Sequence, residues 1–173
     1  MIKLRSEWKP KGEIVHILAS LTPENRLACE ISLATGLRIN DVLALTPEKV
    51  RKQRFTIREE KTGKTRFIRL SKELVTRCLA CSGQHYVFEG RLNGRKHRTR
   101  QAVFKDLKKA CANFSIKENI TPHSMRKAFA VDEFARNGNN LKKVQKLLNH
   151  ESEAVTILYA MANILTRRKN FKK

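Results

Sequence analysis

Apolar residues recur every three or four positions along most of the chain, which is the spacing of helices that bury one face. In residues 8–21, for example, Ile14, Ile17, Leu18 and Leu21 fall on one side of a helix. The same periodicity predicts further helices at residues 22–36, 71–81, 101–114, 122–137, 141–148 and 155–161.

Start and stop signals agree with several of these helices. A threonine followed by proline, which suits the cap and first turn of a helix, occurs at Thr22, Thr46 and Thr121. Gly36 and Gly138 stand where two of the helices are expected to end. The chain is therefore expected to be mainly helical.

Two segments have strand-like sequences instead. Residues 54–58 and 65–70 are joined by a short turn that contains Lys61, Gly63 and Lys64. Gly63 can adopt the positive φ angle that a tight turn needs, so both lysines should project from the tip of a β-hairpin. The predicted fold class is mainly α with a small antiparallel β-sheet, an α+β fold.

The chain has 173 residues, of which 40% are hydrophobic, enough for one domain with its own core. It contains no internal repeat or linker, so residues 1–173 are expected to form a single domain with a basic C-terminal tail at 163–173. No apolar run approaches the roughly 18 residues that cross a bilayer, and no secretory signal opens the chain. These features predict a cytoplasmic protein without a membrane partner.

Basic residues greatly outnumber acidic ones, with 37 Lys and Arg against 16 Asp and Glu and a formal net charge of +21. Such an excess predicts a polyanionic partner, DNA or RNA. The candidate contacts to its sugar-phosphate backbone are Lys64 in the hairpin turn and the basic residues of a flexible loop expected at 82–100, namely Arg91, Arg95, Lys96, Arg98 and Arg100. From composition alone, a solvated charged loop is an equally good interpretation.

The four cysteines lie in segments expected to be helical and partly apolar, which in a cytosolic protein favours reduced, buried thiols over disulfides. Cys78 and Cys81 could be combined with His85 and His97 into a zinc site. Their spacing, however, matches no common zinc finger. No metal site is predicted.

The segment after Thr121 combines features suited to phosphate. His123 and Arg126 are three residues apart in the opening turn of a predicted helix, so they share a face. That turn also has unpaired backbone N–H groups and the positive end of the helix dipole, and both favour a bound anion. This segment therefore predicts a phosphate site.

Arg38 occupies a second position suited to phosphate. It follows Gly36 at the corner between two predicted helices, and Asp41 stands at the start of the second. An arginine held there offers a planar fork to phosphate oxygens. Considered in isolation, the segment is explained more simply by a surface arginine paired with Asp41.

Two further polar residues follow near the C-terminus: His150, after a Leu-Leu-Asn sequence, and Tyr159, nine residues later. In order, spacing and structural setting, the chain resembles the catalytic domain of the tyrosine recombinases, the integrases of phages and mobile elements. The residues that carry this likeness are Arg38, Asp41, Lys61, His123, Arg126, His150 and Tyr159.

The resemblance implies that Tyr159 attacks a DNA phosphodiester, forming a 3′-phosphotyrosine bond and releasing a 5′-hydroxyl. Arg38 and Arg126 would bind the non-bridging oxygens, with a hydrogen bond from His150. Neither a metal nor a cofactor is implied.

Proton transfer in that reaction is implied to use two further residues. His123 would accept the proton of the attacking tyrosine, and Lys61 would protonate the leaving 5′-oxygen. Lys64 is the rival of Lys61, since both lie at the same turn. Asp41 would orient Arg38 or the site.

The resemblance also implies partners. These are double-stranded DNA with a specific recombination site and further copies of the chain, in a tetramer that exchanges C-terminal segments on DNA, in a bacterial or phage-host setting. The N-terminal core-binding domain of the family is expected to be absent. Open alternatives are a catalytically inactive DNA-binding module, another basic nucleic-acid-binding protein, or a topoisomerase or telomere resolvase with the same pocket.

Overall fold

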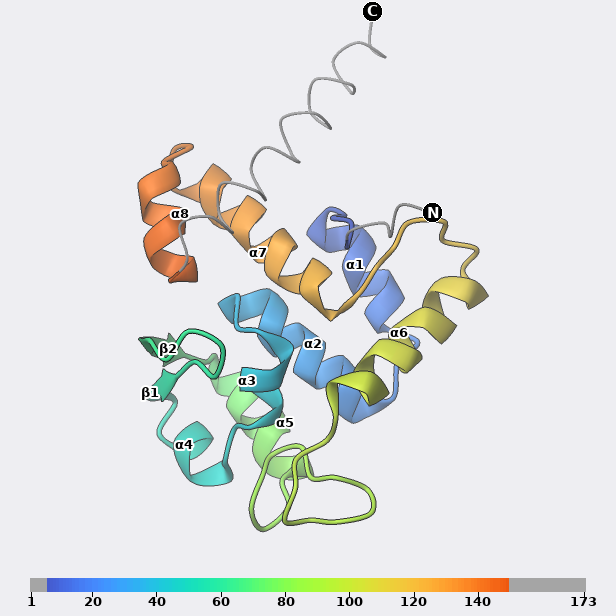
Figure 1. Ribbon diagram of the computed structural model, residues 1–173, viewed down its shortest axis with the longest axis vertical. Coiled ribbons are helices and arrows are strands. Elements are labelled where there is room, and N and C mark those ends of the chain that lie inside the picture. Colours follow the sequence, from blue (N-terminus) through green and yellow to red (C-terminus); the bar gives the residue numbers. More distant parts are fainter. Residues whose placement is uncertain (1–5, 150–173) are drawn as a thin grey trace, which may run out of the picture.

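Helices α2 and α7 pack against each other at the centre of the molecule, and the other elements surround this pair (Figure 1). The structure is a computed structural model that describes residues 6–149. Its elements are α1 (Lys11–Leu18), α2 (Pro23–Thr35), α3 (Ile39–Leu43), α4 (Pro47–Arg51), β1 (Arg54–Arg58), β2 (Thr65–Arg69), α5 (Lys72–Cys81), α6 (Arg100–Asn113), α7 (Pro122–Arg136) and α8 (Leu141–Leu148). The predicted fold class is confirmed; the helix expected at 155–161 lies outside the described residues.

The starts of the helices follow the predicted caps, with one exception. The side chains of Thr46 and Thr121 accept hydrogen bonds from backbone N–H groups of α4 and α7. Thr22 does not cap α2 in this way. Its hydroxyl and its backbone N–H both donate to the carboxylate of Asp106, at 2.8 and 3.0 Å. The start of α2 is therefore fixed by a carboxylate from α6.

Strands β1 and β2 pair in an antiparallel hairpin, with Phe55 opposite Ile68. Phe55, Ile57 and Ile68 are buried, whereas the strand positions that alternate with Phe55 and Ile57 are exposed. Gly63 in the turn has a φ of 65°, as predicted. The inward alternation continues past the end of β1, because Glu59 is fully buried. The hairpin therefore carries a buried carboxylate at the base of its turn.

The core joins all elements up to α7 in one apolar cluster. A smaller cluster lies between α7 and α8 and consists of Phe129, Ala130, Val131, Val144 and Leu148. Among residues 6–149, no helix is both long enough and apolar enough to cross a membrane.

Gly36 makes the close approach of α2 to α7 possible. It ends α2 with a φ of 68°, a backbone conformation that glycine adopts far more readily than other residues. A Cβ atom at this position would lie 2.3 Å from the ring of Phe129 in α7. The carbonyl of Gly36 also accepts hydrogen bonds from Arg66 and Arg126, so this corner is tied to two other segments.

We expect Gly36→Ala to lower the free energy of unfolding by about 2–4 kcal/mol, from backbone strain of about 1 kcal/mol and overpacking of about 1–3 kcal/mol. Gly138→Ala is the matched control. Gly138 also has a positive φ, of 62°, but nothing lies within 4 Å of the added Cβ. Urea unfolding measures both variants, and equal losses would contradict the close packing on Phe129.

Candidate active site

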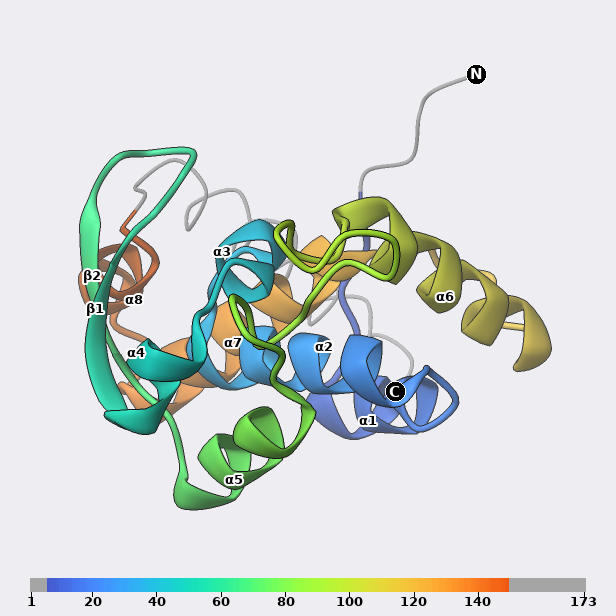
Figure 2. The same ribbon diagram turned by 90° about the horizontal axis from the view of Figure 1, so that it is seen from below.

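A cleft with a volume of about 790 Å³ lies where four segments meet: the corner between α2 and α3, the hairpin turn, the start of α6 and the start of α7. Helix α3 lies between the hairpin and α6 (Figure 2). The lining includes five residues that the sequence pattern assigns to the site, namely Arg38, Asp41, Lys61, His123 and Arg126. The fold therefore brings together residues that are far apart in the sequence.

The start of α7 is fixed by a reciprocal pair of hydrogen bonds. The hydroxyl of Thr121 accepts the backbone N–H of His123 at 3.2 Å. The backbone N–H of Thr121 donates to the hydroxyl of Ser124 at 3.0 Å, which completes a capping box. His123 is exposed at the cleft, whereas Arg126 on the next turn is fully buried. Both residues lie at the start of α7, as predicted.

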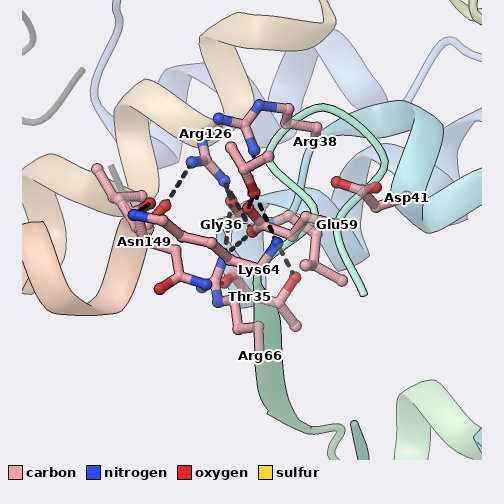
Figure 3. A network of polar contacts seen from close by, with 12 residues as sticks. Thr35, Gly36, Arg38, Asp41, Glu59, Lys64, Arg66, Arg126 and Asn149 are labelled. Atoms are coloured by element: carbon pink, nitrogen blue, oxygen red, sulfur yellow. Dashed lines mark hydrogen bonds and ion pairs between the residues drawn. The ribbon is translucent and has the colours of Figure 1, made fainter. Parts of the chain in front are cut away.

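Arg126 connects three segments of the protein (Figure 3). Its Nη1 donates to the carbonyl of Gly36, and its Nη2 donates to the carbonyl of Leu148 at 2.8 Å. Nη1 also lies 3.9 Å from the carboxylate of Glu59. The guanidinium therefore forms part of the wall of the cleft and is held in place by the end of α2, the end of α8 and the hairpin.

Arg38 precedes the first turn of α3 and is paired with Glu59, not with Asp41. Its Nη1 lies 2.9 Å from Oε2 of Glu59. Asp41 uses its Oδ1 to accept the backbone N–H of Glu60 at 3.0 Å. The alternative of a surface arginine paired with Asp41 is therefore wrong, because the side chain of Arg38 is only 14% exposed and its carboxylate partner comes from the hairpin.

Glu59 and Arg66 complete this polar cluster, and neither was identified from the sequence motifs. Glu59 lies 3.5 Å from Nη1 of Arg66, whose Nη2 donates to the carbonyl of Thr35. Burial lowers the pKa of Arg66, as does the neighbouring charge of Arg126. The strand alternation offered a signal for Glu59, because residues 55, 57 and 59 point inward, and a charged residue at an inward position requires a partner.

Asp41 in α3 contacts the hairpin turn directly. It is buried, and this burial raises the pKa of its carboxyl group above the ordinary value, although the hydrogen bond from the Glu60 N–H lowers it in part. Because Glu60 directly precedes Lys61, the contact fixes the backbone next to the lysine that lines the cleft.

A raised pKa gives Asp41 a defined effect on stability. The protonated carboxyl group of Asp41 is favoured in the folded protein over the unfolded chain. Its contribution to the free energy of unfolding is therefore fully present below the ordinary pKa of 3.8 and is lost as pH rises through the raised pKa of the folded protein. Asp41→Asn removes the titration and keeps an oxygen that can accept the Glu60 N–H. We therefore expect the stability of this variant, relative to wild type, to increase as pH rises across that window. Urea unfolding at several pH values measures this, and a difference that falls with pH would contradict it.

The end of α8 is tied to the hairpin through Asn149. Lys64 Nζ donates to the carbonyl of Asn149 at 3.3 Å, and the amide of Asn149 donates to the carbonyl of Thr65 at 3.2 Å. Asn149 ends α8 in the left-handed conformation and immediately precedes His150 in the sequence. His150 and Tyr159 themselves lie outside the described residues.

Comparison with known proteins decides the family of the chain. A sequence model described as "Phage integrase family" matches residues 10–164. The chain belongs to the phage integrase family. The integrase of Escherichia phage P2 is 29% identical over 158 residues, which cover 91% of this chain and 44% of that protein. Tyrosine recombinase XerD of Listeria innocua is 31% identical over 160 residues, covering 83% of this chain and 52% of that protein.

Solved structures of integrases share the fold of this phage integrase family member. The catalytic domain of bacteriophage HP1 integrase has a TM-score of 0.63 at 22% identity, covering 90% of this chain and 89% of that one. A lambda integrase (75–356) dimer bound to a COC′ core site has a TM-score of 0.73 at 20% identity, with coverage of 91% and 60%. The chain thus has the tyrosine recombinase catalytic-domain fold, and it spans about half the length of the curated relatives it matches.

In this integrase-family chain, the basic segment between α5 and α6 has internal contacts that shape it. The carboxylate of Glu89 accepts the backbone N–H of His85 at 2.8 Å, and Glu89 pairs with His97 in an isolated antiparallel bridge. Arg98 is partly buried, with its Nη2 3.4 Å from Glu24 of α2. The other basic residues proposed to contact DNA are exposed: Arg91, Arg95 and Lys96 in this segment, Arg100 at the start of α6 and Lys64 in the hairpin turn.

The structure does not form the zinc site considered for Cys78, Cys81, His85 and His97. Within the described part of the chain, no three His, Cys, Asp or Glu side chains lie together so that they could hold a metal ion. Cys81 Sγ donates to the carbonyl of Cys78, and His97 Nδ1 lies 2.8 Å from the carbonyl of Arg98. Burial raises the pKa of Cys78 to about 12, so this thiol stays protonated at neutral pH.

Proposed function

We propose that this chain is the catalytic domain of a site-specific DNA recombinase, an integrase-like tyrosine-type strand transferase. The observation that carries the proposal is the cleft in which Arg38, Lys61, His123 and Arg126 meet. They come from three segments: the corner before α3, the hairpin turn and the start of α7. Cationic and hydrogen-bonding groups that converge in this way suit a phosphoryl group whose oxygens gain negative charge in the transition state. The relatives, integrases and recombinases by name, support the same reaction.

In the proposed reaction, the hydroxyl oxygen of Tyr159 attacks a backbone phosphorus atom, and the bond from that phosphorus to the 5′-oxygen breaks. The products are a 3′-phosphotyrosine bond and a 5′-hydroxyl. Arg38 and Arg126 stabilise the non-bridging oxygens, with a further hydrogen bond from His150. Attack by a different 5′-hydroxyl reverses the step and rejoins the DNA in a new combination, without a metal or cofactor.

Two residues at the cleft carry out the proton transfers of this step. Tyrosine has an ordinary pKa of about 10, so its proton must be removed at neutral pH. His123 accepts it, and Lys61 supplies one to the leaving 5′-oxygen. The exposure of His123 and the position of Lys61 in the lining support these roles. Lys64 donates to the carbonyl of Asn149, which favours Lys61 over Lys64 as the acid.

The proposed partners are duplex DNA with a recombination site and further copies of the chain that assemble on it. The net charge of +21 supports a DNA partner. Among structures with the same fold, lambda integrase is a tetramer bound to a Holliday junction, and XerH is bound to its difH substrate. We propose a comparable tetramer here, with exchange of C-terminal segments between copies, in the cytoplasm of a bacterium or a phage host.

Capture of the covalent intermediate tests this function. A duplex is first selected from a random-sequence pool by the full chain, and a nick is then placed so that cleavage releases a short fragment that cannot be rejoined. Protein in excess should yield a protein–DNA adduct that survives denaturing electrophoresis. Tight duplex binding without an adduct would indicate an inactive DNA-binding module, and equal binding of duplex DNA and RNA would indicate a general nucleic-acid binder.

A further inference from the structure

One fully buried carboxylate, that of Glu59, contacts three arginines, of which Arg38 and Arg126 line the cleft and Arg66 lies behind them in β2 (Figure 3). Oε2 of Glu59 lies 2.9 Å from Arg38, and Oε1 lies 3.5 Å from Arg66 and 3.9 Å from Arg126. These arginines come from the corner before α3, from β2 and from α7. The ion pairs of Glu59 thus connect three segments of the site.

The three guanidinium groups around Glu59 need a nearby negative charge. Guanidinium groups gathered in a poorly hydrated region repel one another, and an uncompensated buried charge is strongly unfavourable. The side chains of Arg38, Arg66 and Arg126 are 14%, 10% and 1% exposed. Glu59 reduces this repulsion, and Asp41 also interacts electrostatically with Arg38 and Arg126. Among the described residues of this cluster, the three guanidinium groups still outnumber the two carboxyl groups. A phosphate in the cleft is therefore still attracted.

Glu59 also closes the turn that carries Lys61. Its backbone N–H donates to the carbonyl of Lys64 at 3.0 Å, and its carbonyl accepts the N–H of Gly63 at 2.8 Å. The hydroxyl of Thr62 donates to the carboxylate of Glu59 at 3.0 Å. The position of the lysine turn and the position of the arginines therefore depend on the same residue.

We propose that Glu59 is a positioning residue for strand transfer. It holds the guanidiniums of Arg38 and Arg126 and the turn of Lys61 in one arrangement, and it acts through them without touching DNA, because it is fully buried. This inference rests on the proposed function. Displacement of catalytic groups by about 1 Å can lower a rate by about 10²-fold, so loss of this anchor affects the chemical step more than binding.

The test compares three variants of the full chain. Glu59→Gln keeps the shape of the side chain and removes its charge, and Glu59→Asp keeps the charge and withdraws it by one methylene group. Glu73→Gln, at a side chain that is 77% exposed on α5, controls for the loss of one negative charge. For each, the Kd for the selected nicked duplex, the single-turnover rate of adduct formation at saturating protein, the thermal unfolding midpoint and the arginine Nε–Hε NMR signals are measured.

We expect Glu59→Gln to form adduct about 10²-fold more slowly than Glu73→Gln while its Kd stays within about threefold of that control. Glu59→Asp should fall between Glu59→Gln and wild type. The Nε–Hε signals of the three arginines should be dispersed in wild type and should collapse toward the position of solvent-exposed arginines in Glu59→Gln. A rate equal to the control, or a loss of rate matched by an equal loss of binding, would overturn the proposal.

Two outcomes separate this inference from its premise. If wild type itself forms no adduct, the proposed function fails, and the arginine signals still show whether Glu59 orders the guanidiniums. If Glu59→Gln does not fold, Glu59→Asp carries the test, because it retains the carboxylate. A wild-type rate and unchanged arginine signals in Glu59→Asp would then contradict the positioning role.

Discussion

Tyr159→Phe should abolish covalent adduct formation, lowering its rate by at least about 10⁴-fold, while the Kd for duplex DNA stays within about twofold. The substitution removes only the hydroxyl oxygen that becomes bonded to phosphorus, and the aromatic ring stays. The proposed mechanism assigns His123 and Lys61, which line the cleft, to proton transfer and so provides no substitute nucleophile. The rate is measured by single-turnover capture on the nicked duplex.

The control for this substitution is the only other tyrosine in the chain, Tyr86. Its ring packs edge-on against His97 in the basic segment, with centroids 5.5 Å apart. Tyr86→Phe should form adduct at nearly the wild-type rate. An adduct that persists in Tyr159→Phe, or that disappears in Tyr86→Phe alone, would assign the nucleophile elsewhere and remove the basis of the proposed mechanism.

Arg126→Lys is the second substitution with a large expected effect. Lysine keeps the positive charge, but a single ammonium group cannot reproduce the planar fork that donates to Gly36 and Leu148 through two separate nitrogens. We expect the rate of adduct formation to fall by about 10²–10³-fold. We also expect the free energy of unfolding to fall by about 2–4 kcal/mol, because two buried carbonyls and Glu59 lose a well-placed donor.

Arg136→Lys is the matched control on the same helix. The side chain of Arg136 is 66% exposed and contacts Glu133 at 3.2 Å, so its replacement should change stability by no more than about 0.5 kcal/mol and leave the rate unchanged. Chemical unfolding and single-turnover capture measure both variants. If Arg126→Lys retained wild-type stability and rate, the buried contacts of Arg126 would not be what shapes the cleft.

Much of the fold could be predicted because its signals are local. Thr121 and Pro122 mark the start of α7, and Gly36 marks the end of α2 through its left-handed conformation. The first helix was predicted less well: residues 8–21 were expected, but α1 is Lys11–Leu18. It starts after Pro10, and Trp8 packs against the core from outside the helix. An apolar residue just before a helix fits the same periodicity as the helix itself, so periodicity alone could not show that Trp8 lies outside α1.

The site was predicted as far as its motifs reach. Arg38, Lys61, His123 and Arg126 share the cleft, as the resemblance implied. The partners of these residues could not be predicted from the motifs, because the pairs form between segments that are distant in sequence. Glu59 is 21 residues from Arg38 in sequence, and Asp106 is 84 residues from Thr22. Asp41, the nearest acidic residue in sequence, was expected to orient Arg38 or the site; in the structure it accepts a hydrogen bond from the hairpin backbone and interacts with Arg38 only through charge.

The most direct measurement is the identification of the residue that carries the DNA. The adduct formed by wild type on the nicked duplex is digested with a protease and a nuclease, and the modified peptide is sequenced by mass spectrometry. We predict a nucleotide joined through its 3′-phosphate to Tyr159, together with a released strand that has a 5′-hydroxyl. A nucleotide attached to any other residue, or a strand released with a 5′-phosphate, would contradict the account.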